Sequence, residues 1–377
     1  MRCLYLTAML LLAALLSTAS SMGAAQPGVR ASLTHEGEDY VNMRDVCARY
    51  DQKAGKDKQQ ATHSGNSREV SFTITTKERE YRIILCPGRQ DFYVATNEKK
   101  RYLFVLSHRV LESNGNIYIS STDFQKLVDP VFNPELTKGY EFDTVVLDPG
   151  HGAHDAGATS PYAVEKRCNL SLALKVKKKL EEKRIKVVMT RESDRFLTLG
   201  ERVSFANEMV VKKKRKAIFV SIHHNSSSNR AAKGIETFTL APHGTTSPFA
   251  RTRRTEILSG NNQDSANIAL AAAVHSHVLH GLSKDKNPTP DRGIQRARFS
   301  VLCTIRCPAI LFEAGFVSNA EEGRRISNER YQEKLAEYIV NGIMKYKDNV
   351  SGTATNKASG TVIRPGRNTT SSRTGYR

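Results

Sequence analysis

From Asp143 onward, short apolar runs alternate with segments of helical periodicity. The apolar runs occupy residues 144–148, 185–190, 217–223, 234–241 and 308–316, and the helical patterns occupy 165–183, 201–210, 265–282 and 330–347. Such alternation is typical of an α/β domain. We therefore predict a mostly parallel or mixed sheet flanked by helices over residues 141–347. Ligands of such sheets bind beyond the carboxyl ends of the strands.

The region before this domain has a different pattern. Short β-type runs at 70–76, 81–86, 102–107 and 116–121 and two short helical segments predict a small α+β domain over residues 26–140, with an exposed loop at 54–67. The segments EDYVNMRDVCARY and GNIYISSTDFQKLVDP resemble the N-terminal domain of copper-amine-oxidase-like envelope proteins. That resemblance implies a spacer or binding module without a copper site.

Both ends of the chain have compositions of their own. Residues 1–25 combine Arg2, an apolar stretch and a cluster of small residues, which is the layout of a cleaved secretory signal peptide. An uncleaved membrane anchor is the alternative, but the apolar run is shorter than the roughly 20 residues that a span needs. We expect secretion across the inner membrane to the periplasm or cell envelope. Residues 348–377 are rich in Ser, Thr, Gly and Arg and predict a disordered basic tail.

Four polar residues are expected at one edge of the predicted sheet. His151 and His223 follow the first and third strands, Glu313 ends the last, and Glu165 opens the first helix. Two imidazoles and a carboxylate, with one position left for water, form a catalytic zinc site. A second carboxylate is needed to move protons. We expect His151, Glu165 and His223 to bind one Zn²⁺ and Glu313 to act as the base; satisfied polar residues at strand ends are the alternative.

Several blocks in order resemble one enzyme family. VVLDPGHGAHDAGA, EKRCNLSLALKVKKKL, FVSIHHNSSSNRAAKGIETFTL and PAILFEAGFVSNAEE are similar to successive blocks of the zinc-dependent N-acetylmuramoyl-L-alanine amidases. The resemblance implies hydrolysis of the amide between N-acetylmuramic acid and L-alanine in peptidoglycan, in wall remodelling that includes daughter-cell separation. The family's zinc ligands fall on His151, Glu165 and His223, and its catalytic glutamate falls on Glu313.

The sequence departs from the family pattern at three positions. His224 replaces a small residue, His154 lies in the metal loop, and Cys168 follows Glu165 by one helical turn. His224 joins Asn225 and Arg202 as a candidate substrate contact, although adjacent strand residues face opposite sides. For Arg202 an internal salt bridge is the alternative. Five cysteines follow the leader. They could all be buried thiols, or Cys47 and Cys86 could form a disulfide bridge; both alternatives stay open.

The net charge, one basic run and one short connection limit the binding partners that we expect. The chain of 377 residues has 57 Lys and Arg against 38 Asp and Glu, a net charge of +19, which favours anionic wall polymers besides peptidoglycan. We expect no nucleic-acid partner, because the KKKRK run at 212–216 reads as a solvated loop. The stretch 242–264 is too short for a helix that plugs the site, so we expect no activator. The alternatives to amidase activity are a zinc carboxypeptidase or endopeptidase that acts on the stem peptide and an inactive module that binds the cell wall.

Overall fold

The computed structural model describes residues 29–50, 60–64, 67–76, 80–97, 100–247, 256–285 and 288–352. The predicted leader at 1–25 lies outside the described residues, as does the expected tail from residue 353 onward. Within the described ranges, no helix has both the length and the apolar character that crossing a membrane requires.

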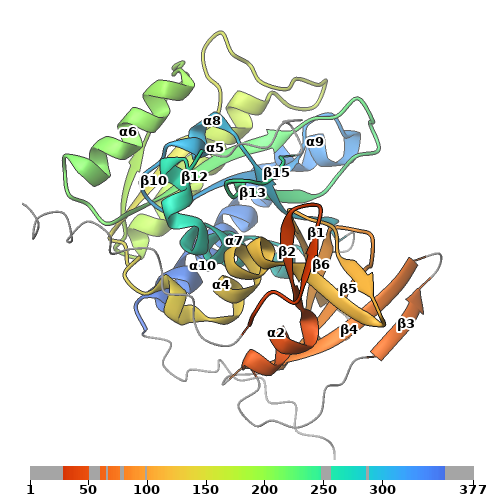
Figure 1. Ribbon diagram of the computed structural model, residues 1–377. Helices are drawn as coiled ribbons and strands as arrows, with labels where there is room; N and C mark the ends of the chain where they lie inside the picture. Colours follow the sequence, from red (N-terminus) through yellow and green to blue (C-terminus); the bar gives the residue numbers. More distant parts are fainter. Residues whose placement is uncertain are drawn as a thin grey trace, which may run out of the picture.

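In the described part of the chain, eleven strands form one mixed sheet and four form a smaller one. The large sheet has the order β11-β10-β12-β15-β13-β14-β7-β6-β5-β4-β3, and the small one β1-β2-β9-β8. Figure 1 shows the large sheet running through the molecule, with the small sheet beside it. The predicted fold class, a mixed sheet flanked by helices with a smaller α+β part, is confirmed.

The amino-terminal part contributes most of the short strands. They are β1 (Leu33–His35), β2 (Glu38–Asn42), β3 (Gln60–Ser64), β4 (Ser67–Thr75), β5 (Glu80–Leu85), β6 (Asp91–Asn97), β7 (Lys100–Val105), β8 (Leu111–Ser113) and β9 (Asn116–Ser120). The helices here are α2 (Met43–Tyr50), α3 (Ser121–Asp123), the π-helix η1 (Phe124–Val128), α4 (Asp129–Phe132) and the 3₁₀ helix η2 (Pro134–Thr137). The prediction of an exposed loop over 54–67 was wrong in part, because residues 60–64 form β3, which pairs with β4.

The rest of the chain alternates strands and helices. The strands are β10 (Thr144–Pro149), β11 (Lys186–Met189), β12 (Ala217–Asn225), β13 (Ile235–Leu240), β14 (Asp291–Ala297) and β15 (Ala309–Phe316). The helices are α5 (Glu165–Glu182), α6 (Leu199–Val211), η3 (Ser259–Gln263), α7 (Asp264–Leu282), α8 (Ser300–Cys303), α9 (Ala320–Ile326) and α10 (Glu329–Val350). Strands β10, β11, β12 and β15 pair in parallel, whereas β13 runs antiparallel to β15.

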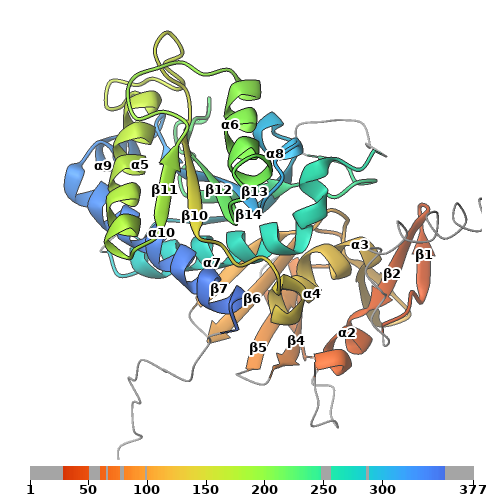
Figure 2. The ribbon, with the colours of Figure 1, turned by 90° about the vertical axis from the view of Figure 1, so that its left-hand side faces the viewer.

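Two apolar layers cover the sheet around β10, β12 and β15. Helices α5, α7 and α10 pack on one face, and α6 and α8 pack on the other. Figure 2 shows α5 and α10 on the opposite side of the strands from α6. Because both faces are covered, the strands are almost continuously apolar, which is typical of parallel sheets in α/β proteins.

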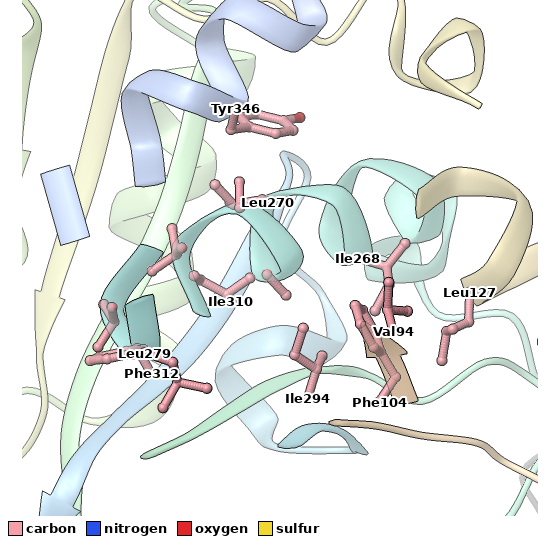
Figure 3. Packing of buried hydrophobic residues seen from close by; sticks show 14 of the residues in the cluster. Val94, Phe104, Leu127, Ile268, Leu270, Leu279, Ile294, Ile310, Phe312 and Tyr346 are labelled. Atoms are coloured by element: carbon pink, nitrogen blue, oxygen red, sulfur yellow. The ribbon is translucent and has the colours of Figure 1, made fainter. Parts of the chain in front are cut away.

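One apolar core extends from the α/β part into the amino-terminal part. Helix α7 lies at its centre: Figure 3 shows Leu270 on the side of Tyr346 from α10, and Ile268 near Val94 and Phe104. The strands are also joined, because β14 pairs in parallel with β7. The large sheet therefore continues past the expected boundary near residue 141.

Candidate active site

His151 lies immediately beyond β10, in the loop that leads to α5. Its φ is +61°, a left-handed backbone conformation that turns the loop back over the strand ends. Gly150 precedes it and allows this close approach, because a Cβ there would lie 2.1 Å from the His223 ring. The loop thus brings the first histidine against the second, with ring centroids 5.0 Å apart.

Glu165 lies between the two imidazoles. It is the first residue of α5, and one oxygen, Oε1, lies 3.1 Å from His151 Nε2 and 2.9 Å from His223 Nδ1. Within the described residues, this is the one group of three or more His, Cys, Asp or Glu side chains that could hold a metal ion, with ligand atoms within 4.8 Å of one another. The structure therefore brings together the three residues expected to bind metal.

A second set of contacts orients these ligands. Asp155 Oδ2 lies 2.8 Å from His151 Nδ1, so the other ring nitrogen faces Glu165. The backbone N–H of Ala158 donates to Glu165 Oε2 at 2.8 Å. Gly157 keeps the space open, because a Cβ there would lie 2.6 Å from Glu165 Oε2. A histidine whose second nitrogen is held by a carboxylate is the usual arrangement in metal sites.

The electrostatics of this group are those of a compact ionic cluster. Burial acts to raise the pKa of Glu165, but hydrogen bonds with His151 and His223 outweigh it and hold the pKa well below its usual range. Burial acts to lower the pKa of His151, but Glu165 and Asp155 outweigh it and raise the pKa. The lowered pKa of Glu165 favours a carboxylate charge at the centre of the cluster, which is the state that binds a cation, whereas His151 binds a cation only as the neutral imidazole.

Glu313 lies beside this cluster on β15, in register with His223 on β12. Its Oε2 is buried, and no group in the described residues makes a hydrogen bond to it. Burial raises the pKa of Glu313 well above its usual range, and the charges of Glu165 and Glu236 add to the effect. An unpartnered carboxyl oxygen with a raised pKa is suited to taking up and releasing a proton.

His223 and Glu313 form a row across neighbouring strands, and this row continues with Glu236 on β13 and Arg292 on β14. Glu236 on β13 is the register partner of Glu313 on the other side. Its carboxylate accepts a hydrogen bond from Asn225 Nδ2 at 2.7 Å and one from Arg292 Nε at 2.5 Å. Asn225, an expected substrate contact, therefore lies at this edge with its amide nitrogen directed to Glu236.

The other two candidate substrate contacts, His224 and Arg202, are both buried. His224 is 1% exposed, and its Nδ1 lies 2.7 Å from Asn169 Oδ1, because adjacent residues of β12 face opposite sides of the sheet. Burial lowers the pKa of His224 to about 4. Arg202 is buried, with Nη1 donating to Asp148 at 2.7 Å and Nη2 to the carbonyl of His151 at 2.9 Å. Arg202 thus holds the backbone of the loop that carries His151.

The remaining departures from the family pattern lie outside the cluster of His151, Glu165 and His223. Cys168 is buried in a small apolar cluster with Ala163 and Val317, and burial raises the pKa of its thiol. His154 packs against Phe196, with ring centroids 4.2 Å apart. The five cysteines in the described ranges form no disulfide with one another. Residues 248–255 of the expected short connection lie outside the described residues.

Three residues near the site escape prediction from the sequence. Asp155 follows His151 by four residues in the same block, so the histidine–carboxylate pairing of metal sites was a usable signal. Glu236 is an acid within the apolar run GIETFTLA, and a charge in a buried strand signals a polar partner. Arg292 has no such signal, because its strand was not predicted.

The geometry is that of an α/β protein with three side chains that could hold a cation and a fourth, unpartnered carboxyl oxygen beside them. The sequence profile of the family described as N-acetylmuramoyl-L-alanine amidase matches residues 145–345. Since the match covers more than half of the chain, this chain belongs to that family of enzymes. The enzyme prediction is thereby confirmed at the level of the family.

Individual relatives agree with this assignment. The chain is 34% identical over 208 residues to the uncharacterized protein YqiI of Bacillus subtilis, covering 55% of this chain and 86% of that protein. It is 33% identical over 223 residues to the N-acetylmuramoyl-L-alanine amidase AmiC of Escherichia coli, covering 54% of this chain. The match spans 52% of AmiC, about half its length.

A solved structure is also similar to about half of the chain. The catalytic domain of CwlV, an N-acetylmuramoyl-L-alanine amidase from Bacillus (Paenibacillus) polymyxa var. colistinus, is 35% identical with a TM-score of 0.44, and the match covers 55% of this chain and 98% of that domain.

Proposed function

We propose that this protein hydrolyses the amide bond between N-acetylmuramic acid and L-alanine in peptidoglycan. The observation that carries the proposal is the convergence of His151, Glu165 and His223 within 4.8 Å, with Glu313 in register beside them, inside the region that matches the amidase family. Residues 141–347 form the catalytic unit in this proposal.

The donor set fits zinc. Two imidazoles and one carboxylate leave a coordination position open, as in catalytic zinc sites. Gly150 and Gly157 leave the space that the ligand side chains need, since a Cβ at either position would overlap them. We propose that His151, Glu165 and His223 hold one Zn²⁺ per chain. A zinc ion at such a site lowers the pKa of water to about 7 and polarises a carbonyl oxygen.

The chain's own groups account for the proton movements. Glu313 accepts a proton at Oε2 as the water oxygen bonds to the lactyl carbonyl carbon. Glu313 then returns the proton to the alanine nitrogen as the C–N bond breaks, which yields a muramoyl carboxylic acid and a free amino-terminal peptide. A raised pKa suits a carboxyl group that acts first as base and then as acid.

The proposed substrate determines where the protein acts. Peptidoglycan lies outside the inner membrane, so we propose a periplasmic or cell-envelope location after secretion. Wall remodelling, including daughter-cell separation, is the process that this reaction would serve. We retain the expectations that anionic wall polymers bind the basic chain and that no activator is required.

Digestion of purified peptidoglycan tests the proposal. The protein loaded with zinc is incubated with sacculi, with and without a chelator, and the products are read by mass spectrometry. Release of intact stem peptides and peptide-free muramic acid, abolished by chelator and restored by Zn²⁺, is expected. Cleavage within the stem peptide would instead identify a carboxypeptidase or endopeptidase, and no cleavage with stoichiometric zinc bound would contradict the enzymatic role.

A further inference from the structure

Arg292 lies at the end of the row formed by His223, Glu313 and Glu236. Strand β14 has an irregular register with β13: Ile235 pairs with Asp291 but Thr237 pairs with Ile294. Arg292 and Gly293 therefore lie opposite Glu236 alone, and Gly293 has φ +93°. Such a bulge redirects a side chain, and here the Arg292 side chain reaches the functional edge.

Two contacts and the space left by a glycine fix the direction of this side chain. Its Nε donates to Glu236 Oε1 at 2.5 Å, and its guanidinium carbon lies 4.9 Å from the centroid of the Phe316 ring. Gly234 provides the space for the stem, because a Cβ there would lie 2.8 Å from Arg292 Cγ. Gly234 is itself held, since its N–H donates to the Glu322 carboxylate at 3.0 Å. The guanidinium is thus oriented before any ligand binds.

The terminal nitrogens of Arg292 remain available. The ion pair with Glu236 uses Nε, and neither Nη makes a hydrogen bond within the described ranges, while the side chain is 39% exposed. Neighbouring strands lie about 4.8 Å apart, so two strand spacings put β14 about 10 Å from Glu313 along the row. This distance corresponds to about three residues of extended peptide.

We propose that Arg292 forms a subsite for a carboxylate on the peptide portion of the substrate, two or three residues beyond the scissile amide. The inference rests on the proposed amidase function. In this substrate the lactyl carboxyl group is part of the amide, so the sugar portion is uncharged, whereas the peptide offers side-chain and terminal carboxylates. The planar guanidinium fork pairs with a carboxylate through two parallel hydrogen bonds. Glu236 occupies only Nε and so orients the fork without filling it.

Matched substrates test the subsite. N-acetylmuramoyl tripeptide amides are prepared in two pairs, with glutamate or glutamine at the second or the third peptide residue. We expect the wild type to prefer the carboxylate member of at least one pair by about 10- to 100-fold in kcat/KM, mainly through KM. Arg292→Gln reduces that ratio to near one, and Arg292→Lys, which keeps the charge but loses the fork, gives an intermediate ratio.

Arg324→Gln is the matched control. Arg324 also lies over an aromatic ring, that of Tyr162 at 4.1 Å, but it is on α9 and donates to Ala320 of its own helix. This variant is expected to keep the wild-type ratio. Equal preference for both members of each pair by the wild type, or an unchanged ratio in Arg292→Gln, would overturn the proposal.

Binding separates this inference from the proposed reaction. The free tripeptide amides are titrated into Glu313→Gln protein by calorimetry, with and without the additional Arg292→Gln change. A carboxylate preference that requires Arg292 supports the subsite even if no substrate is cleaved, in which case only the amidase proposal fails. Cleavage by the wild type without any carboxylate preference in binding leaves the amidase proposal intact and contradicts the subsite.

Discussion

Glu313 and His223 are register partners on two neighbouring parallel strands, β15 and β12. Their side chains therefore leave the sheet at the same level and on the same face. The spacing between the proposed proton acceptor and this proposed metal ligand is fixed by backbone hydrogen bonds and does not depend on a loop. This relationship separates two roles, metal binding and proton transfer, that substitutions can test independently.

Glu313→Gln is expected to abolish hydrolysis while zinc binding persists. The amide keeps the shape of the side chain but cannot accept the proton, and loss of a general base costs about 10²- to 10⁴-fold in rate. Stem-peptide release from sacculi and zinc content per chain are measured together. Glu321→Gln, on the exposed start of α9, is the control. Native-rate release by Glu313→Gln would show that another group takes the proton.

Asp155→Ala is expected to weaken zinc binding about 10- to 100-fold without unfolding the protein. Asp155 holds His151 Nδ1 at 2.8 Å, and such outer partners fix the orientation of a ligating ring. Competition with a chromogenic chelator measures the affinity, and Asp155→Asn shows how much of the effect is due to charge. An affinity equal to that of the wild type would mean that the loop alone positions His151.

Arg202→Met is expected to lower the free energy of unfolding by about 3–5 kcal/mol. Arg202 and Asp148 form an ion pair at 2.7 Å with both side chains buried, and removing one partner leaves the other charge uncompensated. Urea unfolding measures the loss. Arg230→Met, at an exposed position, is the control and should change stability by less than about 0.5 kcal/mol. A similar stability for both variants would show that the buried ion pair contributes little to folding.

Acid is expected to destabilise the amino-terminal part through Asp123. Burial acts to raise the pKa of this carboxyl, but hydrogen bonds from His108, the Ser107 N–H and Ser120 outweigh it and lower the pKa. The pKa of an Asp side chain in an unfolded chain is about 3.9. The stabilisation is therefore fully present above that pH and is lost as the pH falls through the lower folded value, because the unfolded chain binds more protons there.

Asp123→Asn tests this pH dependence. The variant is expected to lose about 1–3 kcal/mol at pH 7 and to show a shallower decline of stability below pH 4. Unfolding midpoints in urea between pH 2.5 and 7 measure both effects. Asp39→Asn, at an exposed position, is the comparison. A variant with the same acid slope as the wild type would assign the acid sensitivity to other groups.

The sequence predicted the parts of the fold where burial dictates composition. Strands β10, β12 and β15 are covered on both faces, so they read as unbroken apolar runs, and their carboxyl ends locate His151, His223 and Glu313. Strand β14 was not predicted. Its sequence, DRGIQRA, begins with two charged residues and a glycine, because its first residues bind other strands through side chains.

The position of Arg292 beside the site depends on the order of the strands in the sheet, which local sequence patterns do not encode. Glu236 meets Arg292 only because β14 lies beside β13 after the long excursion through α7. Likewise, β3 is a polar strand whose pairing with β4 outweighs its weak propensity. The sequence thus predicts functional residues at the ends of buried strands, but it does not predict those whose position depends on the order of the strands in the sheet.

The pairing of β7 with β14 has a consequence for how the molecule melts. Asp291 accepts a hydrogen bond from the Leu103 N–H at 2.8 Å, and the neighbouring Arg292 holds Glu236. A single cooperative heat-absorption peak is therefore expected in calorimetry, with neither half persisting alone. Cutting the chain near residue 141 would expose the β14 border, and such an unpaired border recruits other chains into aggregates.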